Sequence, residues 1–165
     1  MNKFINLIKD RRSIREYTDR HVDMKILEEI VDCGRLAPSA KNIQPWAFIV
    51  VTDKAKLKKI AEQVEWGDFI KDSSACIVVC GDKEVKRFKE DCCLATENMI
   101  LAAKSLGIGS CYVAALGKDT GDVRELLNIP ENLEIVCFLP LGYFEKNPKP
   151  HDKKDLKDLL HWQIF

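Results

Sequence analysis

Residues 75–106, ACIVVCGDKEVKRFKEDCCLATENMILAAKSL, decide the fold of this chain. They open with an apolar run that predicts a buried strand over 75–80, closed by Gly81. From about Glu84 to Leu106 the apolar side chains recur at the helical spacing, which predicts a long α-helix. The positions that follow this repeat are Phe88, Cys92, Ala95, Met99 and Ala103. Leu94, Ile100 and Leu101 add a second apolar side, which is typical of a central helix and makes it a candidate for a subunit contact.

The segments on either side alternate between helical and strand patterns. A short apolar helical stripe covers residues 4–8, and caps at Asp23 and Asp53 predict two further helices, of which the first ends before Pro38. The remaining predicted elements are strands over 46–52, 110–114 and 133–141 and short helices over 121–127 and 155–162. Because no linker interrupts this alternation, we expect a single domain over residues 1–165 that mixes helices and strands.

Charge and hydropathy exclude several classes of protein. Among 165 residues, 26 are Lys or Arg and 26 are Asp or Glu, so the net charge is zero. A general nucleic-acid binder would carry a basic excess, so no nucleic-acid partner is expected. The apolar runs are far shorter than the ~20 residues of a membrane span, and the N-terminus lacks the apolar core of a signal peptide. We therefore expect a cytoplasmic protein with no membrane partner.

The seven cysteines do not follow a metal-binding pattern. None forms a C-x-x-C pair, and the chain has only three histidines. These spacings predict no metal site. An odd number of cysteines without a secretion signal also argues against a disulfide framework, so most are expected to be small core residues.

The densest basic cluster is Arg11-Arg12-Ser13-Ile14-Arg15. Guanidinium groups so close together repel one another unless water or a shared anion neutralises them, and the planar fork of arginine suits a phosphate. The Ser13 hydroxyl adds a further donor. Two interpretations remain open at this point, a phosphate pocket and a solvated basic turn.

Two other segments carry groups suited to a ligand. Residues 37–46, APSAKNIQPW, contain two amide side chains, Asn42 and Gln44, which can read the polar edge of a planar heterocycle. A rigid connection between a helix and a strand would explain the same residues. The tail over 148–154, PKPHDKK, is a second cluster able to bind phosphate, although solvation is its default interpretation. A mixed fold could bring this tail to the first cluster.

These three segments, in this order, resemble the nitroreductase family of flavoproteins, in particular its short single-domain members. The resemblance rests on R-R-S-x-R at 11–15, P-S-x-x-N-x-Q-P-W at 38–46, and the helix that ends in KSLGIGS at 104–110. It continues through Leu141-Gly142-Tyr143 and the paired basic residues before Leu156, so it covers essentially the whole chain.

The resemblance implies an α+β fold in which a mixed, mainly antiparallel sheet is flanked by helices, within an intertwined homodimer. It implies FMN bound without a covalent bond at the subunit interface, with the C-terminal segment reaching the partner. It also implies that NADH or NADPH donates a hydride to flavin N5 in a ping-pong cycle. Nitroaromatics, quinones or similar acceptors would then be reduced. Because the cofactor carries this chemistry, no side chain is predicted to be catalytic.

Carried over to this sequence, the resemblance implies a set of FMN contacts. Arg11, Arg12, Ser13 and Arg15 match the first motif, with the leading basic residues on the phosphate and Arg15 near the N1/O2 edge of the flavin. Pro38, Ser39, Ala40 and Asn42 would come from the other subunit, with Gln44 as a further contact. Ala114 and Ala115 match the backbone near flavin N5, and Lys153 and Lys154 match the phosphate contacts of the tail.

This sequence also departs from the family's pattern. Residues 113–116, VAAL, lack the glutamate that some larger members have near N5. Residues 65–73 are too short for the lid of those members, and Lys153 stands where arginine is frequent. Three alternatives therefore remain: a flavin-binding or redox-sensing protein with little turnover, another reaction of the family such as reductive dehalogenation or flavin breakdown, and an anion-binding module without flavin.

Overall fold

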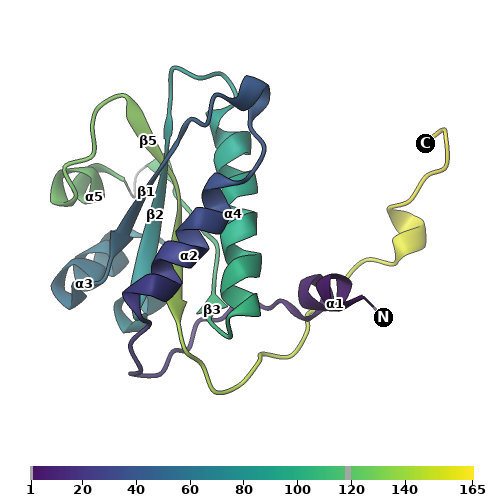
Figure 1. Ribbon diagram of the computed structural model, residues 1–165, viewed down its shortest axis with the longest axis horizontal. Coiled ribbons are helices and arrows are strands. Elements are labelled where there is room, and N and C mark those ends of the chain that lie inside the picture. The colour runs from purple at the N-terminus through teal and green to yellow at the C-terminus, as the bar shows by residue number, and fades with distance from the viewer. Residues whose placement is uncertain (1, 118–119) are drawn as a thin grey trace.

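The computed structural model describes residues 2–117 and 120–165. Its centre is a five-stranded sheet (Figure 1) in which β1 (Trp46–Val51), β2 (Ala75–Asp82), β5 (Leu133–Gly142) and β3 (Gly109–Ser110) lie in that order. The short strand β4 (Val113–Ala114) also pairs with β5, and all these pairings are antiparallel. The predicted α+β architecture with a mainly antiparallel sheet is therefore confirmed.

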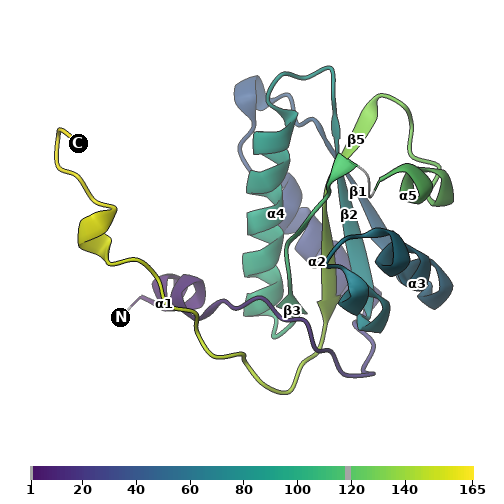
Figure 2. The same cartoon turned by 180° about the vertical axis from the view of Figure 1, so that it is seen from behind.

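Helices cover both faces of this sheet (Figures 1 and 2). The helices α2 (Met24–Arg35) and α4 (Phe88–Ser105) pack on one face, against Ile77 and Val79 of β2. On the other face, α3 (Lys54–Gln63) and α5 (Gly121–Leu126) pack against Val78 and its neighbours. Successive residues of a strand point to opposite faces, so a strand covered on both sides must be apolar throughout. This requirement explains the uninterrupted apolar run that predicted β2.

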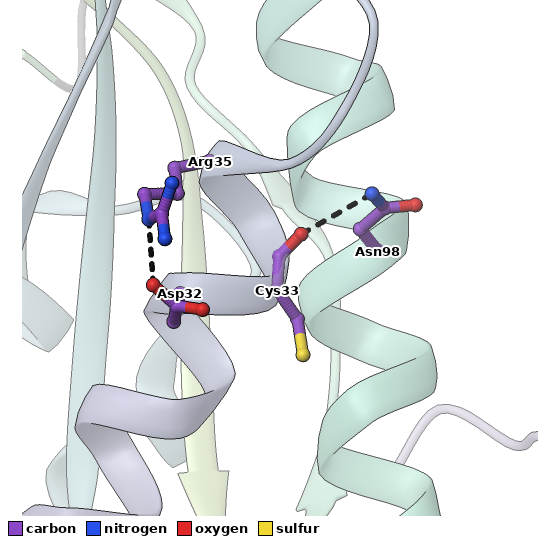
Figure 3. Close-up of polar contacts among 4 residues, drawn as sticks. All are labelled: Asp32, Cys33, Arg35 and Asn98. Carbon is purple, nitrogen blue, oxygen red and sulfur yellow. Dashed lines mark hydrogen bonds and ion pairs between the residues drawn. The ribbon is translucent and has the colours of Figure 1, made fainter.

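The predicted caps begin their helices as expected. Asp23 Oδ1 accepts a hydrogen bond from the Lys25 N–H at 2.8 Å, and Asp53 Oδ1 accepts one from the Lys56 N–H at 2.8 Å. Each carboxylate satisfies an N–H group that has no partner within its helix. The end of α2 is tied to α4, because Asn98 Nδ2 donates to the Cys33 carbonyl at 3.2 Å (Figure 3). Next to it, Arg35 and Asp32 form an exposed ion pair at 2.6 Å (Figure 3).

The long helix begins later than predicted. It starts at Phe88 and not near residue 84, because a turn precedes it. The Asp82 side chain and carbonyl accept hydrogen bonds from the Glu84 and Val85 N–H groups at 3.1 and 3.0 Å. All five residues on its predicted core face are buried. Leu94, on the second apolar side, stays exposed within this one chain.

The predicted strand over 110–114 is split into β3 and β4. Both pieces keep one register on β5, with Ser110 opposite Leu141 and Val113 opposite Phe138. That register places Cys111 opposite Pro140, which has no N–H to donate to the ladder. The missing donor explains why the pairing is interrupted at 111–112.

Both ends of the chain lie outside this body. The first helix, α1 (Lys3–Asp10), buries none of its residues. The expected helix over 155–162 is wrong, since only a 3-10 turn over Leu156–Asp158 forms there. All residues from 145 onward are exposed, and the C-terminal arm projects away from the sheet beside α1 (Figure 2). Its leucines are all exposed within the described part of the chain, and a short helix without packing is marginal in water.

The cysteines behave mainly as core residues, as expected. Cys76, Cys80, Cys92, Cys111 and Cys137 are buried, and all seven are free thiols. Within the described ranges, no group of three or more His, Cys, Asp or Glu side chains could hold a metal ion. No helix in the same ranges is long and apolar enough to cross a membrane.

Candidate functional site

The first basic cluster and the C-terminal tail meet in one cleft. Its volume is about 250 Å³, and it lies between residues 9–15 and residues 148–153. It is lined by Lys9, Arg11, Arg12, Ser13, Arg15, Pro148, Lys149, Pro150, His151 and Lys153. None of these lining residues carries a carboxylate, so the cleft concentrates cations without an internal counter-ion. Such a donor set suits a phosphate or a similar anion.

The edge of the sheet fixes the backbone of the basic cluster. The Ile14 N–H donates to the Ser110 carbonyl at 2.8 Å, and Ser13 forms a parallel bridge with Ser110. Ile14 is buried, whereas the Arg15 side chain beside it is exposed. A Cβ atom at Gly109 would lie 2.8 Å from Ile14 Cγ2, so glycine permits this close approach. The cluster is therefore anchored to the body at Ile14, and its cations face outward.

Tyr17 links the backbone of the basic cluster to β5. Its hydroxyl lies 2.8 Å from the Ile14 carbonyl oxygen and 3.3 Å from that of Pro140. Burial raises the pKa of Tyr17 well above its usual value, so the phenol stays neutral and keeps its proton for donation. The side chain thereby joins the basic cluster to β5.

The three arginines of the cluster have different surroundings. Arg12 Nη1 donates to the carbonyls of Lys9 and Arg11, each at 2.8 Å. It thus caps the C-terminal end of α1, where unpaired carbonyls favour a cation. The Arg15 guanidinium carbon lies 5.8 Å from the centre of the Phe69 ring. Among the described residues, Arg11 has no ion-pair partner, which leaves its guanidinium available to the cleft.

The buried thiol of Cys111 lies beneath these cations. Burial raises its pKa, while Arg15, a hydrogen bond with Ser13, and Arg11 oppose the rise. Burial therefore outweighs the nearby cations, and the Cys111 thiol stays in its neutral form.

The tail contributes more to the cleft than the sequence predicted. Lys153 lines it as expected, whereas Lys154 is exposed and does not. Lys9, Lys149 and His151 line it without having been predicted. The prolines at 148 and 150 gave a signal for this, because they favour an extended chain that can present successive side chains along a cleft.

The second motif lies far from this cleft. Residues 38–44 form a loop with one 3-10 turn, Ala40–Asn42, beside the N-terminal end of α4 (Figure 1). The Ala40 N–H points to the Asp91 carboxylate in the first turn of α4. The basic cluster lies beyond the other end of this helix, next to β3. From Asp91 to Ser105 the helix rises roughly 21 Å at about 1.5 Å per residue. One chain therefore does not bring the two motifs together.

The loop over 39–44 has an unusual backbone. Lys41, Asn42 and Gln44 all have a positive φ, between 53° and 56°. The Ser39 hydroxyl accepts a hydrogen bond from the Gln44 N–H at 2.9 Å, and the Gln44 side chain donates to the Asn42 carbonyl at 3.2 Å. Gln44 is thus partly used inside the loop, while the Asn42 side chain is exposed.

Ala114 and Ala115 lie at the open edge of the sheet. The Ala115 N–H donates to Val136 of β5 at 3.1 Å. Successive N–H groups of an edge strand point in opposite directions, so that of Ala114 faces away from β5. Ala114 is exposed, and no carboxylate stands within residues 113–116. This edge can offer a backbone donor to a ligand.

Comparison with known proteins gives consistent matches over the chain. The family model described as Nitroreductase family matches residues 8–67 and 62–143. A curated relative from Archaeoglobus fulgidus is 41% identical over 162 residues, which are 94% of this chain and 90% of its own length. It carries the provisional name NADH dehydrogenase/NAD(P)H nitroreductase.

Solved structures match equally broadly. One from Bacteroides thetaiotaomicron, with the same provisional name, has a TM-score of 0.93 at 32% identity and covers 100% of this chain and 99% of its own. Another, described as an FMN-dependent nitroreductase from Clostridium difficile, has a TM-score of 0.90 at 33% identity and covers 98% and 99% of the two chains.

Proposed function

Because the chain belongs to the nitroreductase family, we propose that it is an oxidoreductase that binds FMN and uses NADH or NADPH as its electron donor. The acceptors that we propose are nitroaromatics, quinones or similar planar compounds, reduced in a ping-pong cycle. The observation that carries the proposal is the cleft between residues 9–15 and 148–153, whose lining holds cations and no carboxylate.

The residues of this cleft fit the phosphate end of FMN. The guanidinium of Arg11 has no ion-pair partner among the described residues, and Lys149 and Lys153 line the same cleft. Arginine can donate two parallel hydrogen bonds to a phosphate, and lysine supplies a point charge. We propose that Arg11, Ser13 and Lys153 hold the phosphate. Arg12 would contribute mainly by fixing α1, since its guanidinium already serves two carbonyls.

Other residues of this chain are proposed to hold the flavin ring. When bound, FMN accepts a hydride from the nicotinamide and then supplies electrons to the acceptor. Arg15 is proposed to place its charge near the N1/O2 edge. The outward N–H of Ala114 is proposed to donate toward N5, with Ala115 fixing that edge through its own hydrogen bond to Val136. The exposed edge of β4 supports the second assignment, because its outward N–H needs no rearrangement to meet a ligand.

We also propose that the site is completed by a second copy of the chain. The loop with Pro38, Ser39, Ala40 and Asn42 lies at the end of α4 opposite to the basic cleft. A homodimer in which the two long helices meet would place the loop of one subunit near the cleft of the other. Exposed apolar side chains on α1 and along the C-terminal arm, together with Leu94 of α4, support such an assembly.

The presence of FMN is the first expected result. The purified protein should be yellow, and heat should release FMN and not FAD. A colourless protein that takes up no added FMN would leave only the anion-binding alternative. Steady oxidation of NADH or NADPH in the presence of menadione or a nitroaromatic would separate an enzyme from a flavin-binding protein with little turnover.

Mixed dimers test whether the site is shared. The variants Arg11→Ala and Asn42→Ala should each bind FMN weakly as homodimers. On co-expression, a heterodimer carries both changes in one site and leaves the other site intact, so about half of the FMN binding should return. A verified heterodimer that recovers none would contradict the shared site.

Arg15 is expected to tune the flavin. A positive charge near N1/O2 favours the reduced form, which carries more negative charge. Arg15→Gln should therefore lower the reduction potential of bound FMN and slow its reduction by NADH or NADPH. Spectroelectrochemical titration of a variant that still binds FMN checks this, and an unchanged potential would remove Arg15 from that role. Lys154→Gln, an equal loss of charge outside the cleft, is the matched control.

A further inference from the structure

Asp91 of α4 is the one buried carboxylate among the residues that the structure describes. It is only 5% exposed, and no cation pairs with it among the described residues. Burying a carboxylate is costly unless hydrogen bonds or a positive field compensate it. Asp91 has both, because it lies in the first turn of α4, where the helix dipole favours an anion, and because both its oxygens face the Ala40 N–H.

That contact is the polar tie between the loop and the body. The Ala40 N–H lies 3.4 Å from Asp91 Oδ1 and 3.3 Å from Oδ2. The other hydrogen bonds of residues 39–44, within the described part of the chain, are internal to the loop. The loop's three positive φ angles are unfavourable for residues with a Cβ atom, so surrounding contacts must stabilise this conformation. Asp91 is placed to supply the contact that does so.

We infer that Asp91 is a positioning residue for FMN binding: it fixes the loop over 39–44 so that Ser39, Ala40 and Asn42 can reach the cofactor of the partner subunit. This inference rests on the proposed shared FMN site. Asp91 itself does not touch the cofactor. It acts from the far end of α4, so its effect belongs to the loop of its own subunit and to the FMN held by the partner's basic cleft.

Two substitutions at position 91 should show whether the loop needs the hydrogen-bond acceptor of Asp91 or its negative charge. Asp91→Leu removes the acceptor and should weaken FMN binding roughly tenfold or more, the order expected for one hydrogen bond to a charged group. Asp91→Asn keeps a carbonyl oxygen for the Ala40 N–H and should restore most of the affinity. Glu90→Gln is the matched control, since Glu90 lies in the same helical turn and is exposed, whereas the Ala40 N–H contacts Asp91. Its FMN affinity should equal that of the unchanged protein.

Mixed dimers distinguish positioning from a general loss of stability. Asp91→Leu damages the same half of the site as Asn42→Ala, so co-expression of these two variants leaves no intact site. Co-expression of Asp91→Leu with Arg11→Ala leaves one site intact, and about half of the FMN binding should return. A merely structural defect would not follow this division. The pair of Arg11→Ala with Asn42→Ala is run in parallel.

The outcomes separate the two proposals. If the parallel pair regains FMN and the pair of Asp91→Leu with Arg11→Ala does not, the role of Asp91 is overturned and the shared site stands. Normal FMN binding by the Asp91→Leu homodimer would also overturn it. If the parallel pair itself regains nothing, the shared site falls and the role of Asp91 toward the partner falls with it.

A second variant removes the same hydrogen bond from its other end. Ala40→Pro deletes the donor N–H, and proline is tolerated there because Ala40 opens a 3-10 turn and Ser39 before it is extended. If both changes act through one contact, adding Asp91→Leu to Ala40→Pro should weaken FMN binding less than twofold further. Fully additive losses would overturn the inference, and so would normal FMN binding by Ala40→Pro alone.

Discussion

Replacing Arg11 with alanine is expected to weaken FMN binding by about 1.5–3 kcal/mol, which is roughly a 10- to 100-fold rise in Kd. The guanidinium lines the cleft and has no ion-pair partner among the described residues, so its hydrogen bonds are available to a phosphate. Fluorescence titration of the FMN-free protein with FMN measures the effect directly.

The lysines of the tail provide the comparison for Arg11. Lys153→Ala should have a smaller effect, because the exposed tail is less fixed and Lys149 and His151 line the same cleft. Lys154→Ala should have almost none, since Lys154 lies outside the lining. Arg12→Ala is unsuitable as a control because it also removes the cap of α1. An unchanged Kd in the Arg11 variant would exclude that residue from the site.

Removing residues 156–165 is expected to break the proposed dimer and release FMN. In the single chain this arm exposes Leu156, Leu159, Leu160, Trp162, Ile164 and Phe165. Trp162 is 79% exposed. The polar stretch over 145–155 that precedes this arm offers its apolar side chains no surface to pack on. At ~25 cal/mol per Å² of apolar area, burying several such side chains on a partner would contribute several kcal/mol to association.

The truncated chain keeps the cleft itself, because Lys149, His151 and Lys153 all precede the cut. Loss of FMN would therefore report the loss of the partner subunit and not of the phosphate contacts. Sedimentation analysis and the ratio of flavin to protein absorbance are the two measurements. A truncated protein that stays dimeric and yellow would show that the arm does not hold the partner. Gln163→Ala, a polar change within the same arm, should leave both measurements unaltered.

The thermal stability of the body should change little on truncation, since the arm buries nothing in its own subunit. The C-terminal arm differs in this respect from α4, whose residues Cys92, Met99 and Ala103 are fully buried against the sheet and stabilise the domain. The apolar residues of the chain thus form two groups. One stabilises the domain, and the other, exposed in the single chain, is available for assembly.

The sequence by itself determined the features that depend on neighbouring residues. The aspartates at 23 and 53 began their helices, because a cap acts within one turn of the chain. The run over 75–80 became the central strand, because only a strand covered on both faces is apolar throughout. The basic residues at 11–15 and 148–153 stood out by their charge as two clusters able to bind phosphate, although solvation remained an open interpretation for both.

The tertiary structure decided what depends on residues far apart in the chain. Pro140 split the strand over 110–114, and no local pattern announces which residue will stand opposite a proline. Arg12 lines the cleft and also donates through Nη1 to two carbonyls at the end of α1, a contact that the family resemblance did not predict. The two motifs of the proposed cofactor site lie at opposite ends of α4, and the arm beyond residue 155 forms no helix. Caps and periodicity act within a few residues, whereas strand register, the spacing of motifs and the cover of an apolar arm are set by contacts between distant segments.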